Sequence, residues 1–198
     1  MYHSLLKDAT FYNSLLDLDR VIAEQVRLAR CPFCDGNLHQ SHYLRKPRGI
    51  PEKGLHPDYP KRFSFCCGTE GCRKRFTCPS LRFLSRKIYS SVILVLVFLL
   101  KSKTDERKVD ELNHLLGTSL SVETLRRWRH FWVNSVPQSN TWKRAALSYC
   151  LSHHLPVSLL KQFQEDLKKQ LLMTLKWLLP LTAGRHVFDV PFQLITVF

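Results

Sequence analysis

The sequence holds few of the residues from which acid-dependent or phosphate-loop enzymes are built. Only 16 of its 198 residues are Asp or Glu, and only 7 are Gly. No phosphate-binding glycine loop, no His-Glu-x-x-His motif and no Ser/His/Asp order is present. Beyond residue 135 the acidic residues are Glu165, Asp166 and Asp189, too few for a dispersed carboxylate centre that holds two metal ions. We therefore expect a protein that is not an enzyme.

Long hydrophobic runs are also absent. The longest, Val92–Leu100, has nine residues, whereas a helix needs roughly 20 to span a bilayer, so this run predicts a buried helix or strand. The first 20 residues contain no cationic segment followed by an apolar stretch and a small-residue cleavage site. We accordingly expect a cytoplasmic protein with no membrane partner.

Negative charge is the scarcest property of the chain. Lys and Arg number 30 against 16 Asp and Glu, which gives a net charge of +14 and a pI near 9.7. Residues 31–87 alone hold 12 Lys and Arg against 4 Asp and Glu. Because 44% of the residues are hydrophobic, the chain can bury a core. The composition predicts a folded protein with a polyanionic partner, nucleic acid before an anionic membrane surface.

Four segments that differ in composition and hydrophobic pattern predict an α+β protein that is mainly α. We expect an N-terminal helix over residues 1–30, a small β zinc ribbon with basic arms over 31–87, a helix-turn-helix region over 88–136 and C-terminal helices over 137–198. The last of these helices places leucines on one broad face between residues 159 and 178. That face is expected to be core, and if exposed it would form a homodimer.

Six of the seven cysteines lie between Cys31 and Cys78, which indicates metal ligands in a reducing compartment. The first pair is Cys31-Pro-Phe-Cys34, and the second group is Cys66-Cys67-Gly-Thr-Glu-Gly-Cys72. Zn²⁺ prefers four soft ligands in a tetrahedron, which two tight turns joined by strands supply. We predict the ligands Cys31, Cys34, Cys67 and Cys72. The glycines Gly36, Gly68 and Gly71 are expected to give these turns positive φ angles.

Several alternatives to this ligand set stay open. Cys66 competes with Cys67, because neighbouring residues of a strand face opposite ways and only one of the two can easily bind the ion. Cys78, His39 and His42 are further substitutes. The Cys-Pro-Phe-Cys motif also matches the dithiol of glutaredoxin-like oxidoreductases, but these require a strand before the motif and a helix after it. Here a helical pattern precedes the motif and Asp-Gly-Asn follows.

Basic residues flank the second cysteine group. Arg73, Lys74 and Arg75 follow Cys72 directly, and more Lys and Arg are interleaved with aromatic residues up to residue 87. This pattern is suited to contacts with nucleic-acid phosphates. A solvated charged surface is the alternative interpretation.

Residues 110–134 predict two helices joined by a turn. The first ends at Leu116 before Gly117, and Ser121 caps the second, with Glu123 in its first turn. On the second helix, Leu125, Trp128, Phe131 and Trp132 fall on one side, and Glu123, Arg126, Arg127, His130 and Asn134 on the other. The pattern indicates a helix-turn-helix in which Ser121, Glu123, Arg126, Arg127 and His130 face the DNA major groove. An ordinary pair of antiparallel helices is the alternative.

The combined motifs of residues 31–135 resemble the zinc-ribbon and helix-turn-helix portions of insertion-sequence transposases and the small DNA-binding proteins of bacterial mobile elements. The resemblance implies binding of double-stranded DNA at element ends or at the protein's own promoter, as a non-catalytic accessory or regulator with a transposase as partner. A DNA-binding remnant or subunit of a transposase, and an RNA-binding zinc-ribbon protein, remain alternatives.

Overall fold

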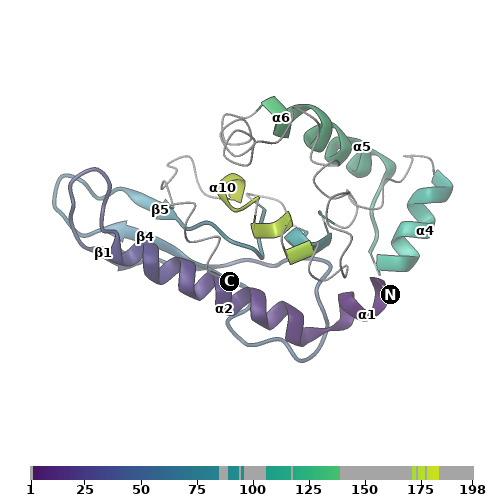
Figure 1. Ribbon diagram of the computed structural model, residues 1–198, viewed down its shortest axis with the longest axis horizontal. Coiled ribbons are helices and arrows are strands. Elements are labelled where there is room, and N and C mark those ends of the chain that lie inside the picture. The colour runs from purple at the N-terminus through teal and green to yellow at the C-terminus, as the bar shows by residue number, and fades with distance from the viewer. Residues whose placement is uncertain are drawn as a thin grey trace. The chain divides into compact units, whose positions relative to one another are not determined.

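The protein is a mixed α+β chain with a small antiparallel sheet (Figure 1). The computed structural model describes residues 2–84, 89–93, 95, 106–116, 118–138, 171–172, 174–176 and 178–182. The helices are α1 (Tyr2–Lys7), α2 (Ala9–Leu28), α4 (Glu106–Leu116), α5 (Val122–His130), the π-helical turn η1 (Phe131–Ser135), α6 (Val136–Gln138) and α10 (Leu179–Thr182). The strands are β1 (Leu38–Gln40), β2 (Tyr43–Leu44), β3 (Lys61–Arg62), β4 (Ser64–Cys67) and β5 (Arg75–Thr77).

The chain divides into two compact units. The cysteine unit comprises Lys7–Ser91 and Leu178–Phe198, and the helical unit comprises Met1–Leu6 and Val92–Trp177. Within the described residues, no helix is both long enough and apolar enough to cross a membrane.

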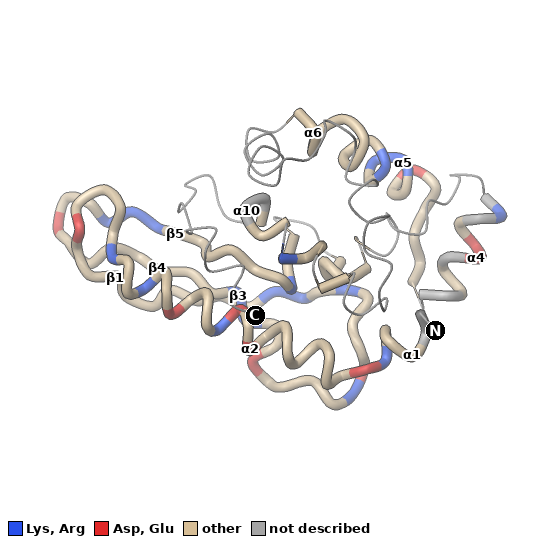
Figure 2. The backbone as a smooth tube through the Cα atoms, in the orientation of Figure 1, with Lys and Arg blue, Asp and Glu red and all other residues tan. Residues whose placement is uncertain are grey.

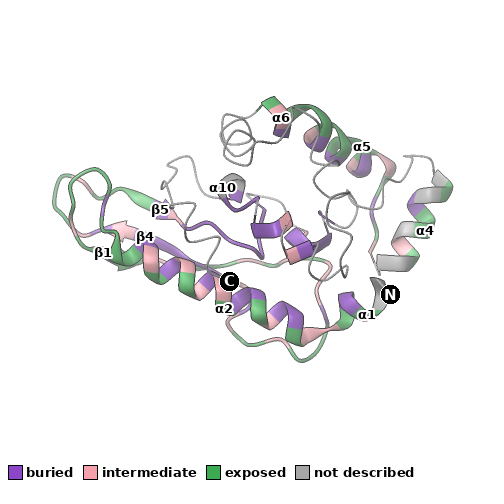
Figure 3. Cartoon of the chain, in the orientation of Figure 1, coloured by how far each residue is buried: buried purple, intermediate pink, exposed green. Residues whose placement is uncertain are grey.

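The N-terminal segment, where one helix over residues 1–30 was expected, forms the two helices α1 and α2. The chain leaves helical geometry at Asp8, whose carboxylate accepts a hydrogen bond of 3.2 Å from the backbone N–H of Phe11. Aspartate is favoured at this position because it satisfies an N–H that the first turn of a helix leaves unpaired. Helix α2 then buries one side at helical spacing (Figure 3): Phe11, Tyr12, Leu15, Leu16, Asp19, Ala23 and Val26.

The described residues of the cysteine unit form a three-stranded sheet with the order β1-β4-β5 and a two-stranded sheet of β2 and β3, and all pairings are antiparallel. Leu38 lies opposite Cys67, and Phe65 lies opposite Phe76, so these residues share one face. All four are buried. The other face carries Cys66 together with its cross-strand neighbours, which are more exposed. The alternation therefore directs Cys67 inward and Cys66 outward.

A buried ion pair holds the cysteine unit together. Arg82 Nε donates to Asp19 Oδ2 at 2.7 Å, and both side chains are completely buried. The Asp19 carboxylate also accepts from the Ser80 hydroxyl and from the Leu81 N–H. Arg82 donates in addition to the carbonyls of Tyr59 and Lys61. One charge pair thus joins α2, the segment before β3 and the segment after β5.

The C-terminal helix α10 belongs to the same unit, although more than 90 residues separate it from β5. The Arg62 guanidinium donates to the Thr182 carbonyl at 2.8 Å, and the Ser80 N–H donates to the Thr182 hydroxyl at 2.7 Å. Arg62, Ser80 and Thr182 are all buried. Tertiary contacts therefore place part of the expected C-terminal region beside the cysteine-rich segment.

The core of the helical unit includes the side of α5 and η1 that the sequence indicated. Leu125, Trp128, Trp132 and Val136 are buried, whereas Phe131, expected in this core, is only half-buried. Val92, Ile93 and Val95 are buried as well, and the rest of the apolar run 92–100 lies outside the described residues. Of the leucine face, Leu171 and Leu175 in this unit and Leu178 in the cysteine unit are buried, and its earlier members lie outside the described part of the chain.

We expect Asp19→Asn to destabilise the cysteine unit by about 3–5 kcal/mol, because it leaves the Arg82 charge buried without its partner. Asp17→Asn removes the same charge from an exposed pair with Arg20 on the same helix and should cost less than about 1 kcal/mol. Urea unfolding of both variants, followed by circular dichroism, measures the difference. Equal losses of unfolding free energy in the two variants would contradict the stabilising role of the buried ion pair.

Candidate functional site

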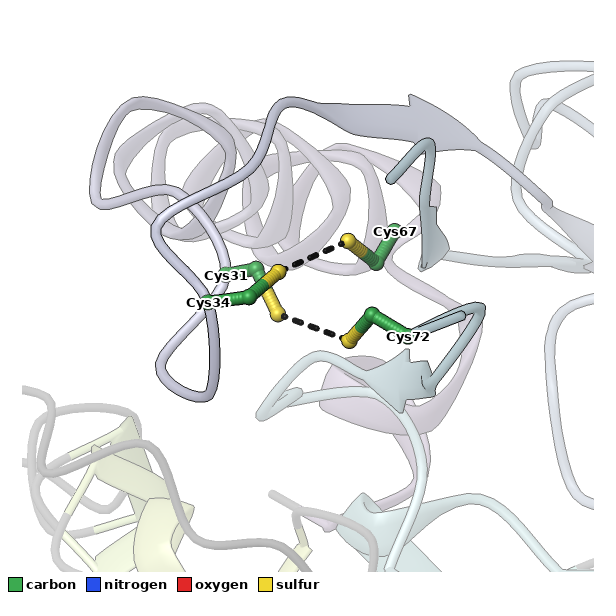
Figure 4. Close-up of side chains that lie close together, drawn as sticks. All are labelled: Cys31, Cys34, Cys67 and Cys72. Carbon is green, nitrogen blue, oxygen red and sulfur yellow. Dashed lines mark hydrogen bonds between the residues drawn. The ribbon is translucent and has the colours of Figure 1, made fainter. Parts of the chain in front are cut away.

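Four cysteines converge at one end of the three-stranded sheet (Figure 4). The sulfur atoms of Cys31, Cys34, Cys67 and Cys72 all lie within 4.8 Å of one another. Cys31 Sγ is 3.7 Å from Cys72 Sγ, and Cys34 Sγ is 3.4 Å from Cys67 Sγ. A disulfide needs about 2.05 Å, whereas sulfurs bound to one tetrahedral ion at about 2.3 Å lie about 3.8 Å apart. The cluster can therefore hold a metal ion.

Two backbone turns present these sulfurs. Cys31 and Cys34 form a turn between α2 and β1, closed by hydrogen bonds from the Asp35 N–H to the Cys31 carbonyl and from the Cys31 N–H to the Gly36 carbonyl. Cys67 ends β4, and a turn leads from it to Cys72. In that turn the Thr69 N–H lies 3.4 Å from Cys67 Sγ. Such an N–H stabilises a thiolate, the form in which cysteine binds a metal.

The glycines of the two turns have a different role from the one expected. Gly71 does have a positive φ of 83°, but neither Gly36 nor Gly68 is among the positive-φ residues. Asp35 and Arg73 take positive φ angles instead. A Cβ at Gly36 would overlap the Thr69 side chain and come within 3.2 Å of Cys67 Sγ. Gly36 is therefore needed for the close approach of the two turns.

The geometry separates the four clustered cysteines from the alternatives. The Cys66 thiol points away and donates to the Arg73 carbonyl. Cys78 is fully buried elsewhere in the core, and burial raises the pKa of its thiol to about 12. His42 contacts the backbone of Ser64 and packs against Phe63 and Phe65, so its ring has a structural role.

The thiols differ in acidity because of their neighbours. Hydrogen bonds from the Thr69 hydroxyl, the Gly36 backbone and a neighbouring thiol lower the pKa of Cys34 to about 6. The backbone of Lys74 lowers the pKa of Cys72, but desolvation and the other three thiols outweigh it and raise that pKa to about 12. The Cys34 thiolate thus forms easily, whereas the Cys72 thiol resists a further negative charge beside it. A divalent cation supplies the compensating charge.

The alternative of a redox dithiol has little support from the local structure. In dithiol oxidoreductases the first cysteine sits at a helix N-terminus, which lowers its pKa. Here Cys31 follows the end of α2, and a turn and strand β1 come next. The thiol with the lowered pKa is Cys34, the second of the motif.

The basic arm after Cys72 packs partly against aromatic rings. Lys74 Nζ lies 3.5 Å from the centre of the Phe33 ring, and the Arg75 guanidinium lies 5.6 Å from that of Tyr43. Arg75 also donates to the Ser41 carbonyl at 2.7 Å. The three basic residues, Arg73 included, precede or begin β5, where Figure 2 colours the tube blue, and all three are exposed. Arg75 therefore supports the fold as well as adding surface charge.

The turn between α4 and α5 is organised by a residue that the sequence pattern did not single out. Asn113 of α4 donates from Nδ2 to the Leu120 carbonyl at 2.9 Å and accepts from the Leu120 N–H at 2.6 Å. Its Oδ1 also accepts from the Thr118 hydroxyl. Ser121 then caps α5 by accepting from the Thr124 N–H, as predicted. An asparagine near a helix end, before a turn of Ser and Thr residues, is the signal that could have indicated this role.

The outward side of α5 is basic and exposed (Figures 2 and 3). Arg126, Arg127 and His130 are exposed, and Arg129 adds a basic residue that was not among the predicted contacts. The Glu123 carboxylate lies 3.6 Å from the Arg126 guanidinium, and both side chains are about two-thirds exposed. An exposed ion pair of this kind is weak, so Arg126 remains available to a ligand. The Ser121 side chain is used in capping and is a weaker candidate for contact with a ligand.

Metal loading of two neighbouring serine variants tests the cluster. Cys67→Ser should lose most of the bound metal, because it removes an inward ligand. Cys66→Ser should keep about one ion per chain, since that sulfur points away. The metal content of each variant is measured after loading with Zn²⁺ or Co²⁺. If Cys67→Ser kept the metal and Cys66→Ser lost it, Cys66 and not Cys67 would be the ligand.

Comparison with known proteins identifies no relative. No protein family matches the chain, and no curated protein or solved structure gives a significant match. The functional interpretation therefore depends on the geometry of the cysteine cluster and of α5.

Proposed function

We propose that this protein binds double-stranded DNA, uses a zinc-stabilised ribbon as a scaffold and has no catalytic activity of its own. The basic outward face of α5 carries the proposal. Arg126, Arg127, Arg129 and His130 are exposed there, and Leu125 and Trp128 on the opposite side are buried. A helix of this kind, capped and preceded by a turn from another helix, is suited to the major groove as the second helix of a helix-turn-helix.

Zinc is the ion we propose for the cysteine cluster. Four cysteine sulfurs within 4.8 Å of one another are a ligand set of structural zinc sites, which leave no open position for catalysis. Two cysteine turns joined by the antiparallel strands β1, β4 and β5 support a ribbon. Binding of such an ion contributes on the order of 10 kcal/mol to the folding of a small domain. Its role is to hold the ribbon and its basic arm in shape.

The charge of the chain supports a polyanionic partner. Four thiolates and one Zn²⁺ together carry two negative charges, so the metal-loaded protein keeps about +12 of its formal +14. Arg73 and Lys74 would add phosphate contacts beside those of α5. We further propose a role as accessory or regulator of a bacterial mobile element, on the basis of the combined motifs alone. In that role a transposase or a second copy of the chain is the protein partner.

RNA binding is the second candidate, and one observation favours it. Phe33 is 48% exposed and Tyr43 is 36% exposed, and each has a cation beside its ring. Aromatic rings interleaved with basic side chains can stack on the bases of a single strand. Preference for single-stranded RNA over duplex DNA would establish this candidate in place of the first.

Selection from genomic DNA tests the proposed function. The zinc-loaded protein is incubated with fragmented host DNA, with and without a chelator, and the bound fragments are sequenced. We expect enrichment of one sequence motif, which disappears when the metal is removed. Uniform recovery of fragments would overturn specific recognition of DNA.

The double variant Arg126→Ala and Arg127→Ala tests the role of α5. We expect weaker binding to the selected site, by about 1–3 kcal/mol for each arginine that reads a base, and a flatter salt dependence. The control, Arg27→Ala with Arg107→Ala, removes the same charge from exposed positions on α2 and α4. Fluorescence anisotropy at several salt concentrations measures both effects. Equal losses of affinity in the two double variants would reject α5 as the recognition helix.

A further inference from the structure

An open hollow of about 220 Å³ lies on the exposed side of α5 and η1. Its lining residues are Arg126, Arg129, His130, Val133 and Asn134. They recur at helical spacing along a single side, and they come from the end of α5 and from the π-helical turn that continues it. Arg127 is not among them.

The π-helical turn shapes this hollow. In it the Val136 N–H donates to the Phe131 carbonyl, five residues back. Trp132 and Val136 are buried, and the three residues between them are all exposed. Two of these three, Val133 and Asn134, line the hollow. Single π-helical turns inside α-helices occur frequently at functional sites.

The charge of the lining selects an anion. The lining residues carry two guanidinium groups, an imidazole and an amide, and none of them is acidic. Within the described residues, neither Arg129 nor His130 forms an ion pair. Guanidinium groups bind phosphate oxygens through paired hydrogen bonds, and the Asn134 amide adds a donor. The lining is thus complementary to a phosphate group.

The size of the hollow and its apolar surface indicate that it binds one part of a larger ligand. At about 220 Å³ it is smaller than the roughly 300–1,000 Å³ of sites that enclose small molecules. The Val133 side chain is 43% exposed and offers an apolar surface. A phosphodiester followed by the carbon atoms of a sugar presents both chemistries to such a site.

We propose that this hollow is a phosphodiester-binding site that holds one backbone phosphate of a nucleic-acid strand. Arg126, Arg129 and His130 contact the phosphate oxygens, and Val133 contacts the adjoining sugar. The assignment of its natural ligand rests on the proposed function, while phosphate binding itself does not. The site positions α5 on the backbone, and Arg127 is left to contact bases.

A direct test uses inorganic phosphate and a dinucleotide monophosphate as probes. Both are titrated into the zinc-loaded full chain, and the NMR signals of the His130 ring, assigned by their disappearance in His130→Gln, report binding. We expect a saturable shift that Arg129→Gln and Asn134→Asp each abolish, since the first removes a guanidinium and the second adds a carboxylate. The matched controls Arg107→Gln and Gln138→Glu make the same charge changes at exposed positions outside the hollow and should keep the shift. Absence of a saturable shift, or its loss in the controls as well, overturns the site.

The second arm measures nucleic-acid binding at 50 and 200 mM salt, with duplex DNA and single-stranded RNA separately. Removal of one phosphate interaction lowers the salt slope by about 0.9 for DNA, so Arg129→Gln should reduce the affinity ratio between the two salts by about 3.5-fold. The nucleic acid that shows this reduction is the source of the phosphodiester. A phosphate shift without binding of either polymer rejects the proposed function but keeps the site. DNA binding with an unchanged slope in Arg129→Gln, and no phosphate shift, rejects the site but keeps the function.

Discussion

The ion pair between Asp19 and Arg82 is the interaction on which the cysteine unit depends. Both charges are completely out of water, so each is stable there only while the other, and the hydrogen bonds around them, are in place. Helix α2 leads from Asp19 into the turn that carries Cys31, and the strand that carries Cys67 follows the carbonyls to which Arg82 donates. The pair therefore aligns, at a distance, the two chain segments that meet at the cysteine cluster. Loss of either charge of this pair is therefore expected to shift the cysteine sulfurs, although neither side chain contacts them.

At the other end of the sheet the four cysteines impose a second constraint. The strands there are only three or four residues long, and a sheet of this size buries little apolar surface of its own. Gly36 allows the two turns to approach within contact distance, and the proposed zinc ion would fix that approach through four bonds. The basic arm begins immediately after Cys72, and its Lys74 and Arg75 are held over aromatic rings. The geometry of this arm therefore follows from that of the cluster.

In the helical unit, the two sides of helix α5 have different roles. Leu125, Trp128 and Trp132 bury one side of α5 and its continuation, while the other side keeps its arginines in solvent. Asn113 holds the turn before α5 through hydrogen bonds to the Leu120 backbone, which sets where the helix begins. Because the basic side is separate from the buried side, substitutions on the basic side should have little effect on folding. Our two proposals for α5, base contact and phosphate contact, occupy neighbouring parts of that side.

Features that depend on local chemistry were predictable from the amino-acid sequence. Cysteine type and spacing indicated the four residues that cluster, the alternation of a strand framed the choice between Cys66 and Cys67, and helical periodicity with a serine cap predicted α5 and most of its buried side. Features that depend on residues far apart in the chain became visible in the folded structure alone. The pairing of Asp19 with Arg82, the anchoring of Thr182 by Arg62 and Ser80, and the overlap that excludes a side chain at Gly36 arise from contacts over more than 30 residues. Burial decides which charges must pair and which glycines have no room for a side chain, and burial is a property of the folded chain.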